Sequence, residues 1–138
     1  MISNHQIYNS NIENHIFYYK KFIIEIKKTF ILISFHKQIY LELEDTQNMY
    51  DMLYQIHLKT NKKLTLLLDV NGVIGTNKAS RDLGTSALAI KITQKLVLVT
   101  DSMISKLMAN FFMKVTPPPY PIRIVNSINE GIKCLQKH

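Results

Sequence analysis

Two short apolar runs constrain the fold of this chain most strongly. The segments KKLTLLLDV (62–70) and KLVLVTD (95–101) are too short for buried helices and are bounded by turn-forming residues. Such runs are typical of strands that are covered on both faces of a sheet. A pattern with helical spacing follows each run, so strands alternate with helices. This order predicts parallel strands joined by right-handed crossovers.

The segment before these runs predicts a β-hairpin and a helix. Residues 18–26 and 30–35 are rich in aromatic and β-branched side chains, which favour two hairpin strands. A short extended piece is expected at 38–43. Asp45 is then expected to cap a helix that ends near Leu58.

Three further helices are expected. The second begins after Gly75, and its inner face is predicted to hold Ala79, Leu83, Ala87 and Ile90. The third spans about 103–115 with a broad apolar stripe, and a proline-rich link leads to a strand at 122–125. Ser127 and Glu130 have the spacing of a capping box at the start of the last helix, whose inner residues are predicted to be Ile128, Ile132 and Leu135.

Length and composition indicate one α/β domain. The 138 residues, with 46% hydrophobic and 20% charged residues, suit a single globular domain. We expect residues 1–15 to be a poorly ordered polar tail and residues 16–138 to form the domain. Its architecture is predicted to be a mixed sheet of about five strands, with an N-terminal hairpin followed by alternating helices and parallel strands.

The cysteine content and the charge distribution indicate the compartment of the protein and the partners that it is expected to bind. A single cysteine, Cys134, excludes an intrachain disulfide, and no apolar run is long enough to span a membrane, so we expect a cytoplasmic protein. Of the net charge of +7, residues 70–138 carry nine basic against three acidic residues. The basic residues are scattered and no binding motif accompanies them, which argues against nucleic-acid binding.

Polar side chains occur where the buried strands end. Ligands of open α/β sheets bind outside the carboxyl ends of parallel strands, where the candidates are Asp69, Asn71, Asp101 and Ser102. The same residue types also cap helices and form turns. The two aspartates have no histidine, lysine or nucleophile at a diagnostic spacing, and the five histidines are not paired at zinc-binding spacing. We therefore expect no enzyme, no metal site and no cofactor.

Much of the chain resembles the SpoIIAA-like, or STAS, superfamily. The segment from Lys63 to Leu135 looks like small uncharacterised bacterial members of that superfamily. The resemblance rests on the LLLDVNGV strand end, the LVLVTDSMISKLMANFFMKV block and the PPYPIRIVNSINEGIKCL segment. Its most distinctive pieces are the Ala-Ser-Arg-Asp run at 79–82 and the Asn-Phe-Phe-x-Lys stretch at 110–114.

The resemblance implies an interaction module, because anti-sigma factor antagonists of this fold dock onto a partner kinase. In those antagonists the phosphorylated serine lies in an Asp-Ser-Ser-Gly motif at the start of the second helix. The corresponding stretch here, 77–80, lacks that motif, so Ser80 and Thr76 are weak substitutes. Lys78, Arg81 and Lys106 are either a modest basic docking face or ordinary solvated charge.

Two functions follow as hypotheses. The first is a non-catalytic, regulatory interaction domain that binds an unidentified protein partner through its second and third helices. The alternative is a carrier of a lipid or another small hydrophobic ligand, as in relatives with the CRAL-TRIO version of the fold. A carrier requires an apolar cavity, whereas a docking module has a solid interior and an exposed patch. The unpaired hairpin edge also predicts homo-oligomers.

Overall fold

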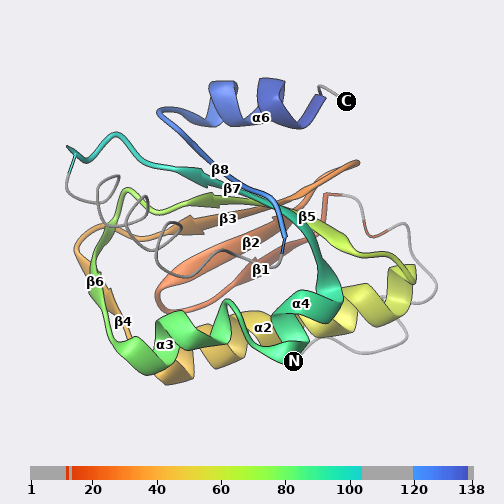
Figure 1. The fold of residues 1–138 in the computed structure, drawn as a ribbon, viewed down its shortest axis with the longest axis horizontal. Coiled ribbons are helices and arrows are strands. Elements are labelled where there is room, and N and C mark those ends of the chain that lie inside the picture. Colours follow the sequence, from red (N-terminus) through yellow and green to blue (C-terminus); the bar gives the residue numbers. More distant parts are fainter. Residues whose placement is uncertain (1–11, 13, 104–119, 137–138) are drawn as a thin grey trace.

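A mixed sheet forms the centre of the molecule (Figure 1). The structure is a computed structural model that describes residues 12, 14–103 and 120–136. The first two pairings along the sheet are antiparallel, and the remaining three pairings are parallel. In spatial order the sheet contains β1 (Ile16–Tyr18), β2 (Phe22–Ile26), β3 (Ile31–Phe35), β5 (Leu64–Asp69), β7 (Thr93–Val99) and β8 (Ile122–Val125). This confirms the predicted mixed α/β architecture, with six strands where about five were expected.

The additional strand comes from a turn inside the first predicted strand. Residues 18–26 were expected to be continuous, which is wrong, because the chain reverses between β1 and β2. The Tyr19 amide donates to the Phe22 carbonyl over 2.9 Å, and the two aromatic rings stack with centroids 4.6 Å apart. Lys20 and Lys21 lie in this turn, but the aromatic residues on either side of them give the whole stretch a strand-like composition that conceals it.

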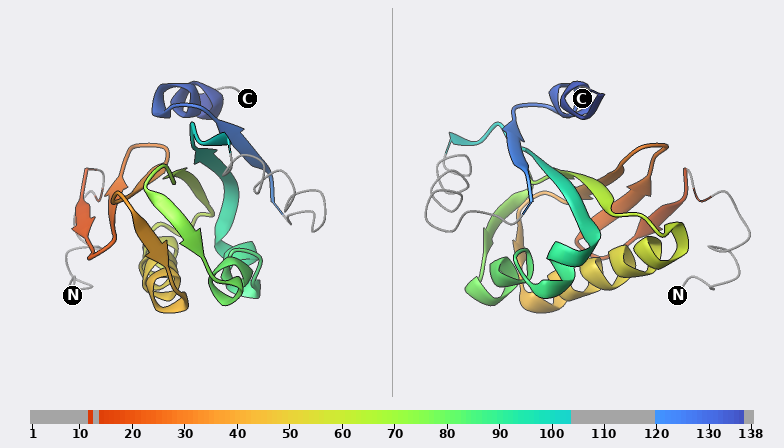
Figure 2. Two further views of the ribbon diagram at one scale, coloured as in Figure 1. Left: turned by 90° about the vertical axis from the view of Figure 1, so that its left-hand side faces the viewer. Right: turned by 45° about the vertical axis from the view of Figure 1, so that its right-hand side comes forward.

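Helices cover both faces of the sheet (Figure 2). Among the described residues, α2 (Leu43–Thr60), α3 (Lys78–Leu83) and α4 (Ala87–Ile92) lie on one face, and α6 (Ile128–Gln136) lies on the other. Adjacent residues of β5 belong to the two separate cores: Leu66 packs in the α2-side cluster and Leu67 in the α6-side cluster. Both are fully buried, which confirms that this strand is covered on both faces.

A helix does begin after Gly75, as predicted, but a strand that was not expected precedes it and the helix is not continuous. The chain first forms a short strand, β6 (Val73–Thr76), and the helical part is then divided into α3 and α4. The division lies at Gly84, whose carbonyl accepts a hydrogen bond from Tyr120, while Ser86 caps α4 by accepting from the Ala89 amide over 3.3 Å.

The predicted inner face of that helix changes with the division. Ser80, Ala89 and Ile92 are buried, whereas Ala79 and Ala87 are exposed and Ile90 is 40% exposed. Leu83 packs partly against the core as expected. The prediction assumed one continuous helix through residues 84–86. Because the helix is interrupted there, the periodicity gave the wrong buried side chains after the interruption.

A two-stranded ribbon projects from the carboxyl end of the sheet. The expected extended piece at 38–43 forms β4 (Ile39–Leu41), which pairs in parallel with β6. The register shifts between the pairs Ile39–Val73 and Tyr40–Gly75, which leaves Ile74 as the extra residue of a β-bulge. A β-carbon on Gly72 would lie 2.0 Å from the His36 carbonyl oxygen, so only glycine permits this approach of the two loops.

The helix starts largely follow the predicted capping. Glu42, not Asp45, is the N-cap of α2, and Asp45 completes the box by accepting from the Glu42 amide over 2.9 Å. At α6 the Ser127 hydroxyl accepts from the Glu130 amide over 3.1 Å, and the Glu130 carboxylate accepts from the Asn126 amide over 3.0 Å. The inner residues of α6 are those predicted: Ile128, Ile132 and Leu135.

Several predicted features concern residues outside the described part of the chain. Most of the predicted tail at 1–15, the third helix at about 103–115 and Lys106 lie outside the described residues. Within the described ranges, no helix combines the length and apolar character needed to cross a bilayer.

Candidate functional site

The polar residues at the strand ends bind one another. The Asp69 carboxylate accepts hydrogen bonds from the Asn71 amide over 3.1 Å and from the Asn71 side chain over 3.0 Å. The side-chain oxygen of Asn71 then accepts from the Asp101 amide over 2.8 Å. Sequence reasoning thus identified residues that meet in space, but their hydrogen bonds to one another close the turns after β5 and β7.

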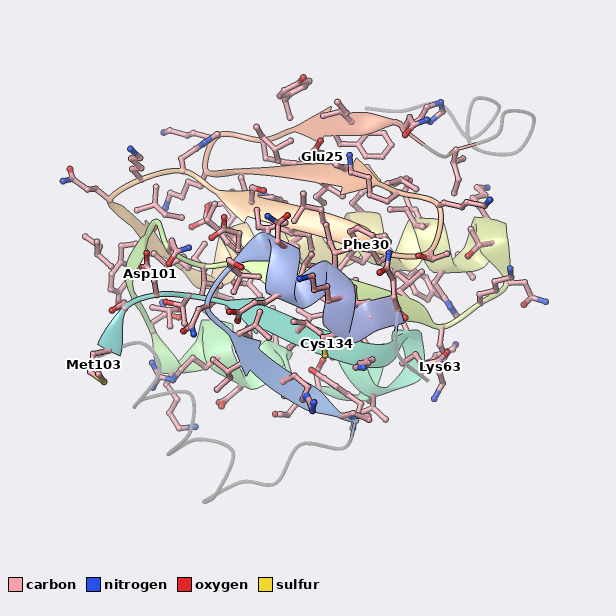
Figure 3. The ribbon with its side chains drawn as sticks, turned by 90° about the horizontal axis from the view of Figure 1, so that it is seen from above. Glu25, Phe30, Lys63, Asp101, Met103 and Cys134 are labelled. Atoms are coloured by element: carbon pink, nitrogen blue, oxygen red, sulfur yellow. The ribbon has the colours of Figure 1, made fainter. Side chains whose placement is uncertain are left out.

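Ser102 and Thr100 continue this turn. The Ser102 amide donates to the Thr100 hydroxyl over 3.1 Å, and the buried Thr100 bonds through its own amide to the Val125 carbonyl. In Figure 3, Asp101 and Met103 lie together at the end of β7, away from α6. None of these contacts pairs a nucleophile with a base.

A shallow hollow of about 380 Å³ opens beside Asp69 and Asn71. Phe35 and Ile74 give its wall an apolar part, and Lys37 adds one cation. The hollow is open to solvent and combines one carboxylate with one ammonium group. Among the described residues, no three His, Cys, Asp or Glu side chains are grouped closely enough to hold a metal ion.

The second set of candidates lies on the ribbon and the helix after it. We call this region the β6–α3 surface and define it by Tyr40, Ile74, Thr76, Lys78 and Arg81. Ile74 is 70% exposed and Tyr40 is 46% exposed, although both are large apolar residues. Lys78 and Arg81 are also exposed. The surface therefore combines uncovered apolar area with two cations.

Hydrogen bonds fix the shape of this surface. The Arg81 guanidinium donates to the Thr76 carbonyl over 2.8 Å, and the Thr76 hydroxyl donates to the Leu41 carbonyl over 3.0 Å. Lys78 pairs with Asp82 one helical turn later, over 2.9 Å. Asn77 begins α3 by accepting from the Ser80 amide over 2.8 Å.

Ser80 lies under this surface. It is 5% exposed, and its hydroxyl shares a hydrogen bond with the buried Thr46 hydroxyl of α2. The structure thus separates the candidates near the start of α3: Thr76, Lys78 and Arg81 lie on the β6–α3 surface, whereas Ser80 joins α3 to α2.

An ion pair anchors the ribbon to the start of α2. Lys21 donates to the Asp45 carboxylate over 2.7 Å and to the Tyr40 carbonyl over 2.9 Å. The hydrogen bond to Asp45 raises the pKa of Lys21 above its usual range, against an opposing effect of burial. Burial alone would raise the pKa of Asp45, but hydrogen bonds from Lys21 and the Glu42 amide outweigh it and lower that pKa.

Sequence reasoning missed Ile74 and Tyr40. Tyr40 lies in the extended piece expected at 38–43, and no strand was predicted at Ile74. No periodicity in the sequence reveals that β4 and β6 pair with each other in a two-stranded sheet. The available signal was the pair of glycines, Gly72 and Gly75, on either side of Val73-Ile74. Glycines at such spacing mark bulges and close backbone approaches.

Comparison with known proteins supports the fold and identifies a family. No curated protein matches the chain. A solved structure from Shewanella loihica PV-4, described as an uncharacterised protein of the DUF3478 family with a SpoIIAA-like fold, is similar to it. The TM-score is 0.59 at 13% identity, over 92% of this chain and 98% of that one. This likeness confirms the SpoIIAA-like fold predicted from the sequence.

The family assignment comes from the sequence itself. A family model described as a domain of unknown function, DUF7793, matches residues 24–138, from the second strand of the sheet to the end of the chain. The chain belongs to the DUF7793 family.

Proposed function

We propose that this protein is a non-catalytic interaction domain that docks onto a partner protein through the β6–α3 surface. The observation that carries the proposal is Ile74, which is 70% exposed at a β-bulge directly before the cations of α3. Bulges redirect side chains and often occur at functional sites. Lys78 is paired with Asp82, and Arg81 leaves the surface with a net positive charge. An exposed apolar side chain beside that charge suits a partner surface that is apolar with an acidic rim.

The contacts at the strand ends support a non-catalytic role. Asp69, Asn71 and the Asp101 amide are bonded to each other in the turns after β5 and β7. Catalysis by general acid and base requires a nucleophile or a reacting group within reach of a base. The hydrogen bonds among these residues are explained by their role in forming the turns.

The hollows favour docking over the carriage of a lipid. A carrier needs an enclosed, mainly apolar cavity. The hollow beside Asp69 is open and contains Lys37. A second, of about 650 Å³ between β8 and α6, is also open and is lined by Lys95, Arg123 and Lys133 among others. Neither has the character of a lipid pocket, so we prefer the docking function.

The proposal does not depend on phosphorylation of Ser80. That hydroxyl is buried against Thr46, so a kinase would reach it only if α3 separated from α2. Thr76 is half-buried and its hydroxyl is bonded to Leu41. A regulatory role would therefore act through occupancy of the surface by its partner.

Site-specific photocrosslinking tests the proposal. Benzoylphenylalanine is introduced at Ile74 in the protein's own cells, and at Leu58 as the matched control. Leu58 is 53% exposed but lies near the other end of α2. We expect one discrete protein adduct from the Ile74 position, reduced at least tenfold in a Lys78→Glu/Arg81→Glu background, and none from the Leu58 position. Equal labelling at both positions, or no adduct at Ile74, would contradict the proposal.

A further inference from the structure

We propose a second binding site, on the opposite side of the sheet, at which β8 receives an acidic, extended segment of a partner protein as an added strand. The site lies between the edge of β8 and helix α6. Three features support it: backbone groups at the strand edge, an open groove beside them, and uncompensated positive charge.

The outer edge of β8 has unpaired backbone groups. In the described part of the chain, β8 pairs only with β7 and is the last strand on this side of the sheet. The Leu96 amide bonds to the Pro121 carbonyl and the Thr100 amide bonds to the Val125 carbonyl, each over 3.0 Å. Alternate residues of a strand bond to the same neighbour, so the amides and carbonyls of Ile122 and Ile124 face outward.

A groove follows this edge. It has a volume of about 650 Å³ and is bounded by β8 and α6, with Ile124, Val125 and Cys134 among the apolar residues that line it. In the view of Figure 3, Cys134 lies between α6 and β8. An added strand would place alternate side chains into this groove while its backbone pairs with Ile122 and Ile124.

The groove carries three cations and one carboxylate. Lys95 of β7, Arg123 of β8 and Lys133 of α6 line it together with Glu130. None of the three cations appears in the ion pairs of the described residues. Glu130 is already engaged, because its carboxylate accepts from the Asn126 amide. The positive charge is therefore available to an incoming acidic group.

This combination favours an acidic peptide over other occupants. A nucleic acid would use the cations but would leave the outward amides and carbonyls of β8 without strand partners. A second copy pairing through β8 would bring like charges together, which is unfavourable. An extended acidic segment satisfies both the backbone edge and the charge.

Fluorescence anisotropy with defined peptides on the full chain tests the site. The probe is a labelled eight-residue peptide in which valine alternates with glutamate. One control has lysine in place of glutamate. Two further controls carry N-methyl groups on alternate amides, one on the odd residues and the other on the even residues. Because alternate amides of a strand point to opposite edges, each control blocks hydrogen bonding along one edge of the peptide only. We expect the lysine peptide and one N-methylated peptide to bind at least tenfold more weakly, and the other N-methylated peptide to bind within about threefold.

Substitutions locate the binding on this edge. Arg123→Glu removes a groove cation, and Ile124→Pro removes an outward amide without breaking the pairing to β7. Each should weaken the acidic peptide at least tenfold. Lys28→Glu makes the same charge change at an exposed turn outside the groove and should have less than a twofold effect. The acidic peptide should also slow the alkylation of Cys134, the single cysteine.

Several results would overturn the proposal. They are no binding of the acidic peptide, equal binding of both N-methylated peptides, or affinity that is unaffected by Arg123→Glu. Tighter binding of a twelve-nucleotide thymidine strand than of the peptide, lost on Arg123→Glu, would assign the groove to nucleic acid instead.

Discussion

Tyr120 donates a hydrogen bond from its hydroxyl to the carbonyl oxygen of Gly84, 36 residues earlier in the chain. The hydroxyl of Tyr50, on α2, in turn donates to Tyr120. Both side chains are buried, and burial raises the pKa of each above its usual range, so both hydroxyls remain protonated donors at neutral pH. This chain of bonds links α2, the end of α3 and the start of β8.

Removal of the two hydroxyls should have unequal effects. Tyr120→Phe leaves the Gly84 carbonyl and the Tyr50 hydroxyl without this partner, and should lower the free energy of unfolding by about 1 to 3 kcal/mol. Tyr50→Phe leaves the bond to Gly84 intact and should cost about 0.5 to 1.5 kcal/mol. Urea denaturation of both variants and the double variant measures the coupling. A larger cost for Tyr50→Phe, or strict additivity, would contradict the linked arrangement.

The pair of Lys21 and Asp45 predicts a pH dependence of stability. The pKa of Asp45 is lowered from 3.8 in the folded state, so its contribution is present above that pH and is lost as the pH falls through the folded pKa. The pKa of Lys21 is raised from 10.5, so its contribution is present below that pH and is lost as the pH rises. The pair therefore stabilises the fold most between these two values.

Asp45→Asn tests this window, because asparagine can still accept from the Glu42 amide but carries no charge. We expect the wild type to lose more stability than the variant as the pH falls through 3.8. Urea midpoints at neutral and acid pH provide the comparison. Parallel curves for the two proteins would show that the pair does not contribute.

Gly131 sets the distance between α6 and the sheet. A β-carbon there would lie 2.5 Å from a methyl group of the fully buried Leu67. Gly131→Ala should gain about 0.5 to 1 kcal/mol of helix propensity but lose about 1 to 3 kcal/mol through overpacking, with a net loss of roughly 1 kcal/mol. Thermal unfolding measures the sign. Gly131→Ala/Leu67→Val should recover part of the loss, and a more stable single variant would refute the close contact.

Ser80 provides a test of the junction between α2 and α3. Ser80→Ala removes one hydrogen bond, and should cost about 0.5 to 1.5 kcal/mol because Thr46 also bonds to the Glu42 carbonyl. Ser80→Asp buries a charge and should cost about 3 kcal/mol or more. Equal stabilities for the two variants would mean that Ser80 is more accessible than its burial indicates.

The predictable part of the fold rests on patterns that are bounded by clear turn or capping residues. The apolar runs around Leu66 and Val97 identified the central strands, and the Ser127–Glu130 spacing located the last helix. Errors arose where a turn interrupts a continuous pattern. Tyr19 looks like a strand residue but lies at a turn, and α3 ends before Gly84, whose carbonyl accepts a hydrogen bond from Tyr120. That contact joins distant segments and is invisible to local periodicity.

The candidate site was only partly predictable for the same reason. Strand-end reasoning brought Asp69, Asn71 and Asp101 together correctly, since parallel strands end at one edge. It did not anticipate that they would bond to one another. The exposure of Ile74 depends on a bulge in a ribbon whose two strands are separated by all of α2 and β5, so no local pattern specifies it.

Native mass spectrometry of the tagged protein, captured gently from its own cells, tests the central claim most directly. The wild type is compared with an Ile74→Asp/Lys78→Glu/Arg81→Glu variant and with Leu58→Asp as the control. We predict a stoichiometric complex with another protein for the wild type and the control, and its loss in the triple variant. A co-purifying small molecule in place of a protein, or a complex that persists in the triple variant, would contradict docking through the β6–α3 surface.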